Sequence, residues 1–292
     1  MTLILRPVTE QDRPRILAIS AQIWDGEDYV PEQFTEWLAD RDGEVIGAEL
    51  DGVLIAFARR TWLHPGHAWF EGIRTDPAFR GRGAGRTITK YLIESARRAG
   101  AEKIHLSTYI ENEASIHIIE SHGFRRVASF ATLEKEVSTE SDEDDEHDDV
   151  VDISHEETVA FVDRSYFLAL GQRRFPRGWR FMPFDLDPLE ATARLGTRIG
   201  IRRSGDLVAL MCLRQPVGAE GGTVLNFADG RPDDLRRLLR HVHRLYAGRT
   251  IAVMVPKVGE REAALLPILR AFNYKTWDDY APAVLVYELD LS

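Results

Sequence analysis

The chain has 292 residues, a length that suits two domains better than one. Its net charge of −10 disfavours nucleic acid as a partner, and no apolar run approaches the length of a membrane span. The first residues lack a secretory signal, and Cys212 is the single cysteine, which excludes an intrachain disulfide and a thiolate metal cluster. We expect a cytoplasmic protein that binds no metal, no membrane and no nucleic acid.

The first half of the chain predicts a sheet with helices on it. A first strand is indicated by the alternation of Leu3 and Leu5, and a hairpin by the Asp51-Gly52 turn. The amphipathic pattern over 84–99 predicts a long helix that ends at Gly100. The other expected elements are helices over 16–24 and 31–38 and strands over 44–48, 53–60, 68–74 and 104–108.

A glycine-rich loop, Arg80-Gly81-Arg82-Gly83-Ala84-Gly85, joins a predicted strand to the long helix. Glycines at a helix start leave backbone N–H groups uncovered, and the helix dipole makes that end attractive to anions. Arg80, Arg82 and Arg86 add positive charge. The loop therefore predicts a pyrophosphate site. Its spacing fits neither the dinucleotide fingerprint nor the P-loop, because both require glycines or a lysine at other positions.

Two motifs resemble those of the GNAT acetyltransferases. The loop reads R-x-x-G-x-G, as in the coenzyme A loop of that family, and the segment 112–116 followed by Gly123-Phe124 is similar to its N-x-A-[AS]-I…G-F motif. The resemblance implies an α/β (α+β) fold with a mixed central sheet flanked by helices, and acetyl-CoA as cosubstrate. The residues that it assigns to acetyl-CoA are Ile73, Arg74, Thr75, Arg80, Gly81, Arg82, Gly83, Ala84, Gly85, Arg86, Asn112 and Ser115.

The resemblance also implies direct attack of an amine on the acetyl thioester. Glu71 is the candidate general base, because it lies two residues before Ile73 and hence on the same face of the strand; a structural ion pair is the alternative role. Where the family often has a tyrosine as general acid, this chain has Ile119. Ser115, His122 and Tyr109 are alternatives, and the reaction can also proceed without an acid, since coenzyme A is a fair leaving group.

The acceptor is expected to contact the segment 23–31, which combines acidic and aromatic side chains. Its Gly-Glu-Asp-Tyr-Val-Pro stretch, together with 71–74, resembles the vertebrate histidine N-acetyltransferases over roughly the first 90 residues. This favours a small-molecule amine or an amino acid as acceptor. A protein or peptide acceptor and a non-catalytic acetyl-CoA sensor remain alternatives. The candidate substrate residues are Trp24, Glu27, Asp28 and Tyr29, for which core packing and helix capping are the competing roles.

Between Glu134 and Asp152 there are eleven acidic residues and one lysine, so this stretch carries the whole net charge. We expect a catalytic domain over 1–136, a solvated acidic linker over 137–150 and a second domain over 151–292.

The second domain repeats the order of elements of the first. Its predicted elements are strands over 198–203, 206–213, 223–228 and 250–255 and helices over 232–246 and 261–272. Asp233 and Asp234 stand where the first half has its glycines, and carboxylates there repel a phosphate. We therefore interpret it as a degenerate second copy of a tandem GNAT fold without a coenzyme A site. It is expected to shape the acceptor pocket or to form a contact in a homodimer. The basic and aromatic stretch 173–181 is expected to be structural or to line the substrate site.

Overall fold

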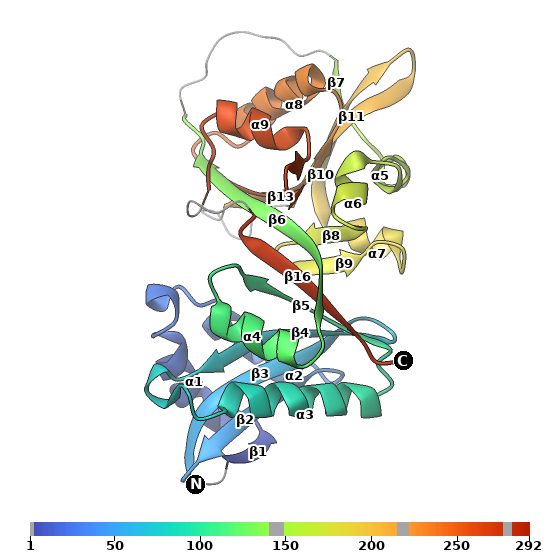
Figure 1. Ribbon diagram of the computed structural model, residues 1–292. Coiled ribbons are helices and arrows are strands. Elements are labelled where there is room, and N and C mark those ends of the chain that lie inside the picture. Colours follow the sequence, from blue (N-terminus) through green and yellow to red (C-terminus); the bar gives the residue numbers. More distant parts are fainter. Residues whose placement is uncertain (1–2, 140–148, 215–221, 277–281) are drawn as a thin grey trace. The chain divides into compact units, whose positions relative to one another are not determined.

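The computed structural model describes residues 3–139, 149–214, 222–276 and 282–292 (Figure 1). The chain forms two compact units: Met1–Leu106, Asn112–Arg125 and Tyr287–Ser292 make up the first, and Ser107–Glu111 and Arg126–Val286 the second. The units thus alternate along the chain, whereas we expected two continuous domains, 1–136 and 151–292, joined by a linker. Most of the expected acidic linker, residues 140–148, lies outside the described residues.

Strands of the first unit follow the order β1-β2-β3-β4-β5. Neighbours up to β4 are antiparallel, and β4 and β5 are parallel because helix α3 connects them. The last residues of the chain, from Tyr287 on, belong to this unit, and Tyr287 donates a hydrogen bond to Glu120 (2.9 Å). The strands are β1 Leu3–Pro7, β2 Glu44–Leu50, β3 Val53–His64, β4 His67–Thr75 and β5 Lys103–Tyr109.

Two helices cover the strands of the first unit from different sides. On one side α2 buries Phe34 and Trp37 in a cluster with Phe57 of β3. On the other side Tyr91 of α3 donates a hydrogen bond to Glu44 of β2 (2.7 Å). The helices are α1 Arg13–Ser20, α2 Val30–Ala39, α3 Ala84–Arg98 and α4 Glu113–Ser121, with short 3-10 turns η1 Glu10–Asp12, η2 Trp24–Gly26 and η3 Pro77–Phe79.

Strand β4 carries a β-bulge near its end. Arg59 of β3 lies opposite Glu71, and Phe57 lies opposite Arg74, so Gly72 and Ile73 together face one residue of β3. Gly72 has φ +61°, and a Cβ atom at this position would lie 2.3 Å from the Trp37 ring. Only glycine fits both the backbone and the contact. The bulge therefore lies at Ile73, the first of the β4 residues that the family resemblance assigns to acetyl-CoA.

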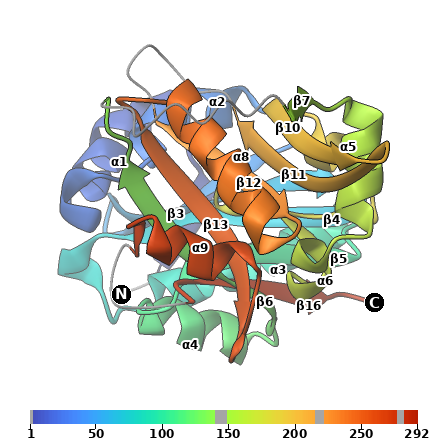
Figure 2. The same cartoon turned by 90° about the horizontal axis from the view of Figure 1, so that it is seen from above.

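The second unit repeats the strand plan of the first. The pairs β10–β11 and β11–β12 are antiparallel, and β12 and β13 are parallel and joined by α8, as β2, β3, β4, α3 and β5 are in the first unit. Helix α8 lies over the strands of its unit and runs nearly along β13 in this view (Figure 2). Its strands include β6 Arg125–Glu136, β7 Val150–Asp152, β10 Leu195–Arg203, β11 Asp206–Arg214, β12 Thr223–Asp229, β13 Thr250–Val258, β15 Lys275–Thr276 and β16 Val284–Asp290, whose last residues lie in the first unit.

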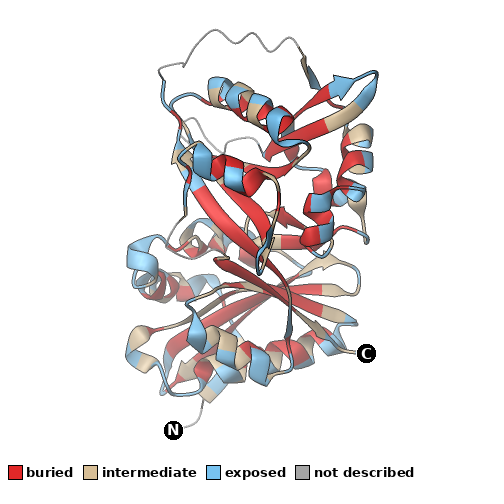
Figure 3. Cartoon of the chain, turned by 45° about the horizontal axis from the view of Figure 1, so that its top comes forward, coloured by how far each residue is buried: buried red, intermediate tan, exposed pale blue. Residues whose placement is uncertain are grey.

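Segment 155–192 of the second unit holds elements that the sequence pattern did not assign. They are α5 His155–Asp163, α6 Tyr166–Leu170, β8 Arg174–Arg177, β9 Arg180–Pro183 and α7 Pro188–Thr192. Phe175 and Phe181 of the β8–β9 hairpin are fully buried, so part of the basic and aromatic stretch is core. Figure 3 shows the buried residues concentrated on the strands.

Two predicted helices have different limits in the structure. The helix expected over 261–272 was wrong at its start: β14 Arg261–Glu262 pairs with β13 after a turn at Gly259, and α9 Leu265–Ala271 begins later. Helix α1 ends at Ser20 instead of Trp24, because the chain turns into η2. α8 Pro232–Leu245 agrees with its prediction. No helix among the described residues is long and apolar enough to cross a membrane.

Candidate functional site

The glycine loop is anchored at its start by Asp76, which is buried. Its backbone N–H donates to the Ile55 carbonyl of β3 (2.9 Å), and its carboxylate accepts the Ala78 N–H (2.8 Å). Arg15 of α1 forms an ion pair with the same carboxylate. These contacts fix the chain where it leaves β4 and enters η3, so the following loop starts from a defined position.

The loop itself presents bare backbone. Gly81 and Gly83 have φ of +76° and +81°, and a Cβ atom added at either would meet nothing within 4 Å. Gly83 is the N-cap of α3 and has no side chain to close the helix end, and the Thr87 N–H makes the first helical bond, to the Gly83 carbonyl (2.9 Å). The N–H groups of the first turn precede that bond and have no intrahelical acceptor. Such a cradle fits a pyrophosphate.

Three arginines predicted at this loop, Arg80, Arg82 and Arg86, are exposed beside it. Arg82 lies over the Phe79 ring, 5.5 Å from its centroid. Exposed guanidinium groups around a helix N-terminus add to the positive potential of the dipole. Ala84 is buried, and a Cβ atom at Gly85 would lie 3.3 Å from Ile118 of α4 and 3.8 Å from the hydroxyl of Thr75, so these two positions pack the helix start.

Asn112 and Ser115 act together as a helix cap. The side-chain oxygen of Asn112 accepts the backbone N–H of Ser115 at the start of α4 (3.3 Å). This is the structural role that an asparagine before a helix commonly has. The cap uses the carbonyl oxygen of Asn112, so its amide nitrogen takes no part in the cap.

Substrate residues predicted on the loop before α2 gather around Arg74. The Arg74 guanidinium donates two hydrogen bonds to Asp28, from Nη2 to Oδ1 (2.9 Å) and from Nε to Oδ2 (3.1 Å), and the Asp28 side chain is fully buried. The same guanidinium lies over the rings of Trp24 (4.5 Å) and Tyr29 (5.4 Å). The side chain of Arg74 therefore holds the loop before α2, whereas its backbone belongs to the segment predicted to face acetyl-CoA.

Tyr29 joins this loop to the bulge of β4. Its phenol oxygen accepts the backbone N–H of Gly72, and its ring packs edge-on against Trp37 (6.2 Å). Burial raises the pKa of Tyr29 to about 12; Arg74 acts against this, and the charges of Glu71 and Asp28 add to it. The phenol is neutral at physiological pH, and Glu71 lies close enough to influence it.

Glu71, the predicted base, forms an ion pair. Arg59 Nη1 donates to Glu71 Oε1 (2.6 Å), and the side chains are 7% and 8% exposed respectively. The ion pair that we considered as the alternative role of Glu71 is therefore present. A carboxylate held by an arginine still accepts a proton from a neighbouring amine, so the contact does not exclude the catalytic role.

Other predicted residues lie outside this cluster. Glu27 is exposed, and its backbone N–H donates to the Trp24 carbonyl (3.0 Å). Tyr109 ends β5 in the segment that groups with the second unit. Ile119 is buried, and His122 makes a 2.8 Å contact through Nδ1 with the Ile118 carbonyl.

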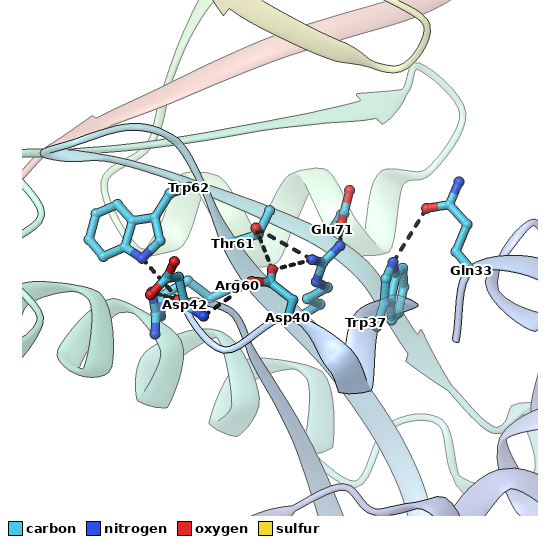
Figure 4. A network of polar contacts seen from close by, with 9 residues as sticks. Gln33, Trp37, Asp40, Asp42, Arg60, Thr61, Trp62 and Glu71 are labelled. Atoms are coloured by element: carbon cyan, nitrogen blue, oxygen red, sulfur yellow. Dashed lines mark hydrogen bonds and ion pairs between the residues drawn. The ribbon is translucent and has the colours of Figure 1, made fainter. Parts of the chain in front are cut away.

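Sequence reasoning missed Trp37, Arg59 and Asp40. Arg59 pairs with both Glu71 and Asp40 and lies over the Trp37 ring, and Trp37 lies against Gly72. Figure 4 shows Trp37, Asp40 and Glu71 from close by. The alternation along β3 puts Arg59 on the same face as Phe57 and could have indicated a buried cation. No group of three or more histidine, cysteine or acidic side chains suited to a metal occurs in the ranges that the structure covers.

Comparison with known proteins identifies the family of the chain. Residues 13–124 match the acetyltransferase (GNAT) family. The N-alpha-acetyltransferase RimI of Mycobacterium tuberculosis is 31% identical over 124 residues, which cover 41% of this chain and 77% of that protein. The histidine N-acetyltransferase of Oreochromis niloticus is 34% identical over 87 residues, but these cover 30% of this chain and only 26% of that protein.

Solved structures share the fold over nearly the whole chain. A GCN5-related N-acetyltransferase from Sphaerobacter thermophilus has a TM-score of 0.65 at 15% identity, with 99% of this chain and 95% of that chain covered. The predicted fold, a mixed sheet flanked by helices, is confirmed. The chain belongs to the acetyltransferase (GNAT) family.

Proposed function

We propose that this protein moves an acetyl group from acetyl-CoA to the primary amine of a free amino acid or similar small molecule, by direct attack of the amine. The observation that carries the proposal is the position of one bulge. Gly72 and Ile73 lie between Glu71, the candidate base, and Arg74, which binds Asp28 of the loop before α2. The next residue, Thr75, ends the strand that leads to the glycine loop, so all three parts of the proposed site meet within five residues of β4.

Acetyl-CoA supplies the acetyl group as a thioester when it is bound. In the proposal the backbone N–H groups from Gly81 to Arg86 hold its pyrophosphate, and the exposed Arg80, Arg82 and Arg86 add charge. Each hydrogen bond to a charged group is worth roughly 1.5–3 kcal/mol. The backbone of Ile73, Arg74 and Thr75 and the side chain of Asn112 are assigned to the pantetheine arm.

Glu71 accepts the proton that the attacking amine loses. Deprotonation of an α-amine, with a pKa of ~8, costs about 3 kcal/mol less free energy than deprotonation of a lysine side chain, with a pKa of ~10.4. In the proposal the acceptor binds at the loop before α2. Trp24 of this loop is 52% exposed, so its ring is available to a small cationic substrate, while Asp28 and Tyr29 hold the loop in place beneath it. The similarity to histidine N-acetyltransferases favours a free amino acid.

No side chain is assigned as general acid. Ile119 occupies the position at which the family often has a tyrosine, and a buried hydrocarbon side chain cannot protonate a thiolate. Ser115, Tyr109 and His122 stay alternatives. Coenzyme A is a fair leaving group, so the proposed reaction does not depend on an acid.

A second candidate acceptor is the amino terminus of a peptide or protein. The similarity to RimI favours it, because that relative is matched over 77% of its length. Both candidates present an α-amine to Glu71, so they differ in what surrounds the amine and share the same base.

An acceptor panel separates these candidates. Free amino acids, including histidine, and short peptides with a free α-amine are supplied with acetyl-CoA, and release of the coenzyme A thiol is followed; the N-acetylated forms of the same compounds are the controls. We expect turnover with free amino acids. Faster turnover of the peptides would favour the second candidate, and binding of acetyl-CoA without turnover of any amine would favour a sensor.

A further inference from the structure

One guanidinium separates two carboxylates beside the bulge of β4. Arg59 Nη1 donates to Glu71 Oε1 (2.6 Å), and Arg59 Nη2 forms an ion pair with Asp40, the residue that follows α2. The two strands bring Arg59 and Glu71 directly opposite each other. Figure 4 shows Asp40, Thr61 and Glu71 gathered in this network. Each end of the planar guanidinium therefore holds a different carboxylate.

The position of this guanidinium is determined by its surroundings. Arg59 lies over the Trp37 ring (5.4 Å), and Trp37 also contacts Gly72 and Tyr29. Thr61 donates a hydrogen bond to Asp40 (3.0 Å). Although burial acts to raise it, the pKa of Asp40 lies below its usual value because Arg59 and Thr61 donate hydrogen bonds to the carboxylate. Asp40 is therefore a second negative charge next to Glu71.

We propose that Arg59 is a positioning residue for Glu71, which holds the Glu71 carboxylate at the bulge and keeps it ionised by separating it from Asp40. The inference rests on the proposed function, in which Glu71 accepts the proton of the amine. The Glu71 side chain is 8% exposed and that of Asp40 24%, and without the cation that both contact their charges repel each other, which favours a shared proton. A shared proton would occupy the group that has to accept one.

The network also defines the charge that the acceptor meets. Two carboxylates and one guanidinium give −2 + 1 = −1, so the site is acidic overall even though Glu71 is paired. An amine arrives as an ammonium ion and is attracted by this charge. Lysine could not replace the arginine in this role, since a single ammonium group lacks the two-sided planar fork.

The main test is Arg59→Met, with Arg60→Met as matched control. Arg60 is the next residue of β3 and equally buried, but it pairs with Glu44 (3.6 Å) on the side of α3. We expect R59M to lower kcat/KM for the amine by about 100-fold at neutral pH, the size of a typical general-base contribution, with an unchanged KM for acetyl-CoA. The deficit should shrink as pH rises and the shared proton dissociates. R60M should not show this pattern.

Two double variants distinguish positioning from a merely structural role. In R59M/D40N the second charge is gone, so Glu71 can ionise again, and we expect part of the lost activity to return although a further polar contact has been removed. In R59M/E71Q the loss should not exceed that of E71Q alone, because both changes act through one carboxylate. If R59M is insoluble, Arg59→Lys replaces it, with the same rescue expected from Asp40→Asn.

The outcomes separate the inference from the proposed function. A slow E71Q together with an R59M variant that behaves like R60M, or a double variant R59M/D40N that is slower than R59M, overturns the positioning role alone. An E71Q variant with wild-type turnover at all pH values overturns the base assignment and the positioning role with it.

Discussion

Substitution of Glu71, the proposed general base, is the most direct test of the proposed chemistry. The Glu71→Gln substitution keeps the size of the side chain and a partner for Arg59 but cannot accept a proton. We expect kcat to fall by about 100-fold at neutral pH, with little change in acetyl-CoA affinity. The deficit should decrease as pH approaches the pKa of the amine, because the neutral amine is then already present. Initial rates of thiol release from pH 6 to pH 10 provide the measurement.

Glu44→Gln is the control for this substitution. Glu44 is a partly buried carboxylate that pairs with Arg60 and accepts a hydrogen bond from Tyr91, on the face of the sheet that α3 covers. We expect its pH–rate profile to match the wild type. An E71Q profile that also matches the wild type would mean that Glu71 is structural and that the base lies elsewhere.

At the residue scale, the features encoded in short motifs could be predicted from the sequence, whereas contacts between distant residues could not. The glycine loop follows from local backbone rules, because glycines at a helix start need no partner elsewhere in the chain. The pairing of Arg74 with Asp28, 46 residues away, leaves no local trace in the sequence. Arg59 was missed for the same reason: its two partners come from a helix end and a neighbouring strand, which only the tertiary fold brings together.

At the scale of elements, the start of α3 is the part that holds acetyl-CoA in the proposal. Gly83→Asp places a negative side chain where a pyrophosphate would lie, at a position that now faces open space. We expect loss of measurable acetyl-CoA binding with a folded protein. The control is Gly178→Asp in the β8–β9 turn, which also has positive φ (+70°) and open space around it, and so imposes similar backbone strain far along the chain from the loop. Equal acetyl-CoA affinity in both variants would refute the assignment.

Elements with strong periodicity were predicted well, and short ones were not. The 14-residue helix α8 and the hairpin β10–β11 follow directly from apolar spacing and a Ser-Gly turn. Strand β14, Arg261–Glu262, was predicted as the start of a helix, because two residues of strand give no alternation to detect. Helices of five residues, such as α6 and α7, are stabilised by tertiary packing and capping, which single-sequence patterns do not show.

At the scale of the whole molecule, the two units differ at the start of the helix that joins their parallel strands. In the first unit α3 begins at bare glycines, whereas α8 of the second begins with Pro232, Asp233 and a buried Asp234 that pairs with Arg203. A carboxylate at a helix start interacts with the positive end of the helix dipole and repels a phosphate from it. We therefore propose that acetyl-CoA binds to the first unit alone.

A calorimetric titration of the full chain with acetyl-CoA tests this central claim most directly. The predicted result is one site per chain, which G83D removes completely and G178D leaves in place. Two equivalent sites per chain, or a single site that persists in G83D, would contradict the account.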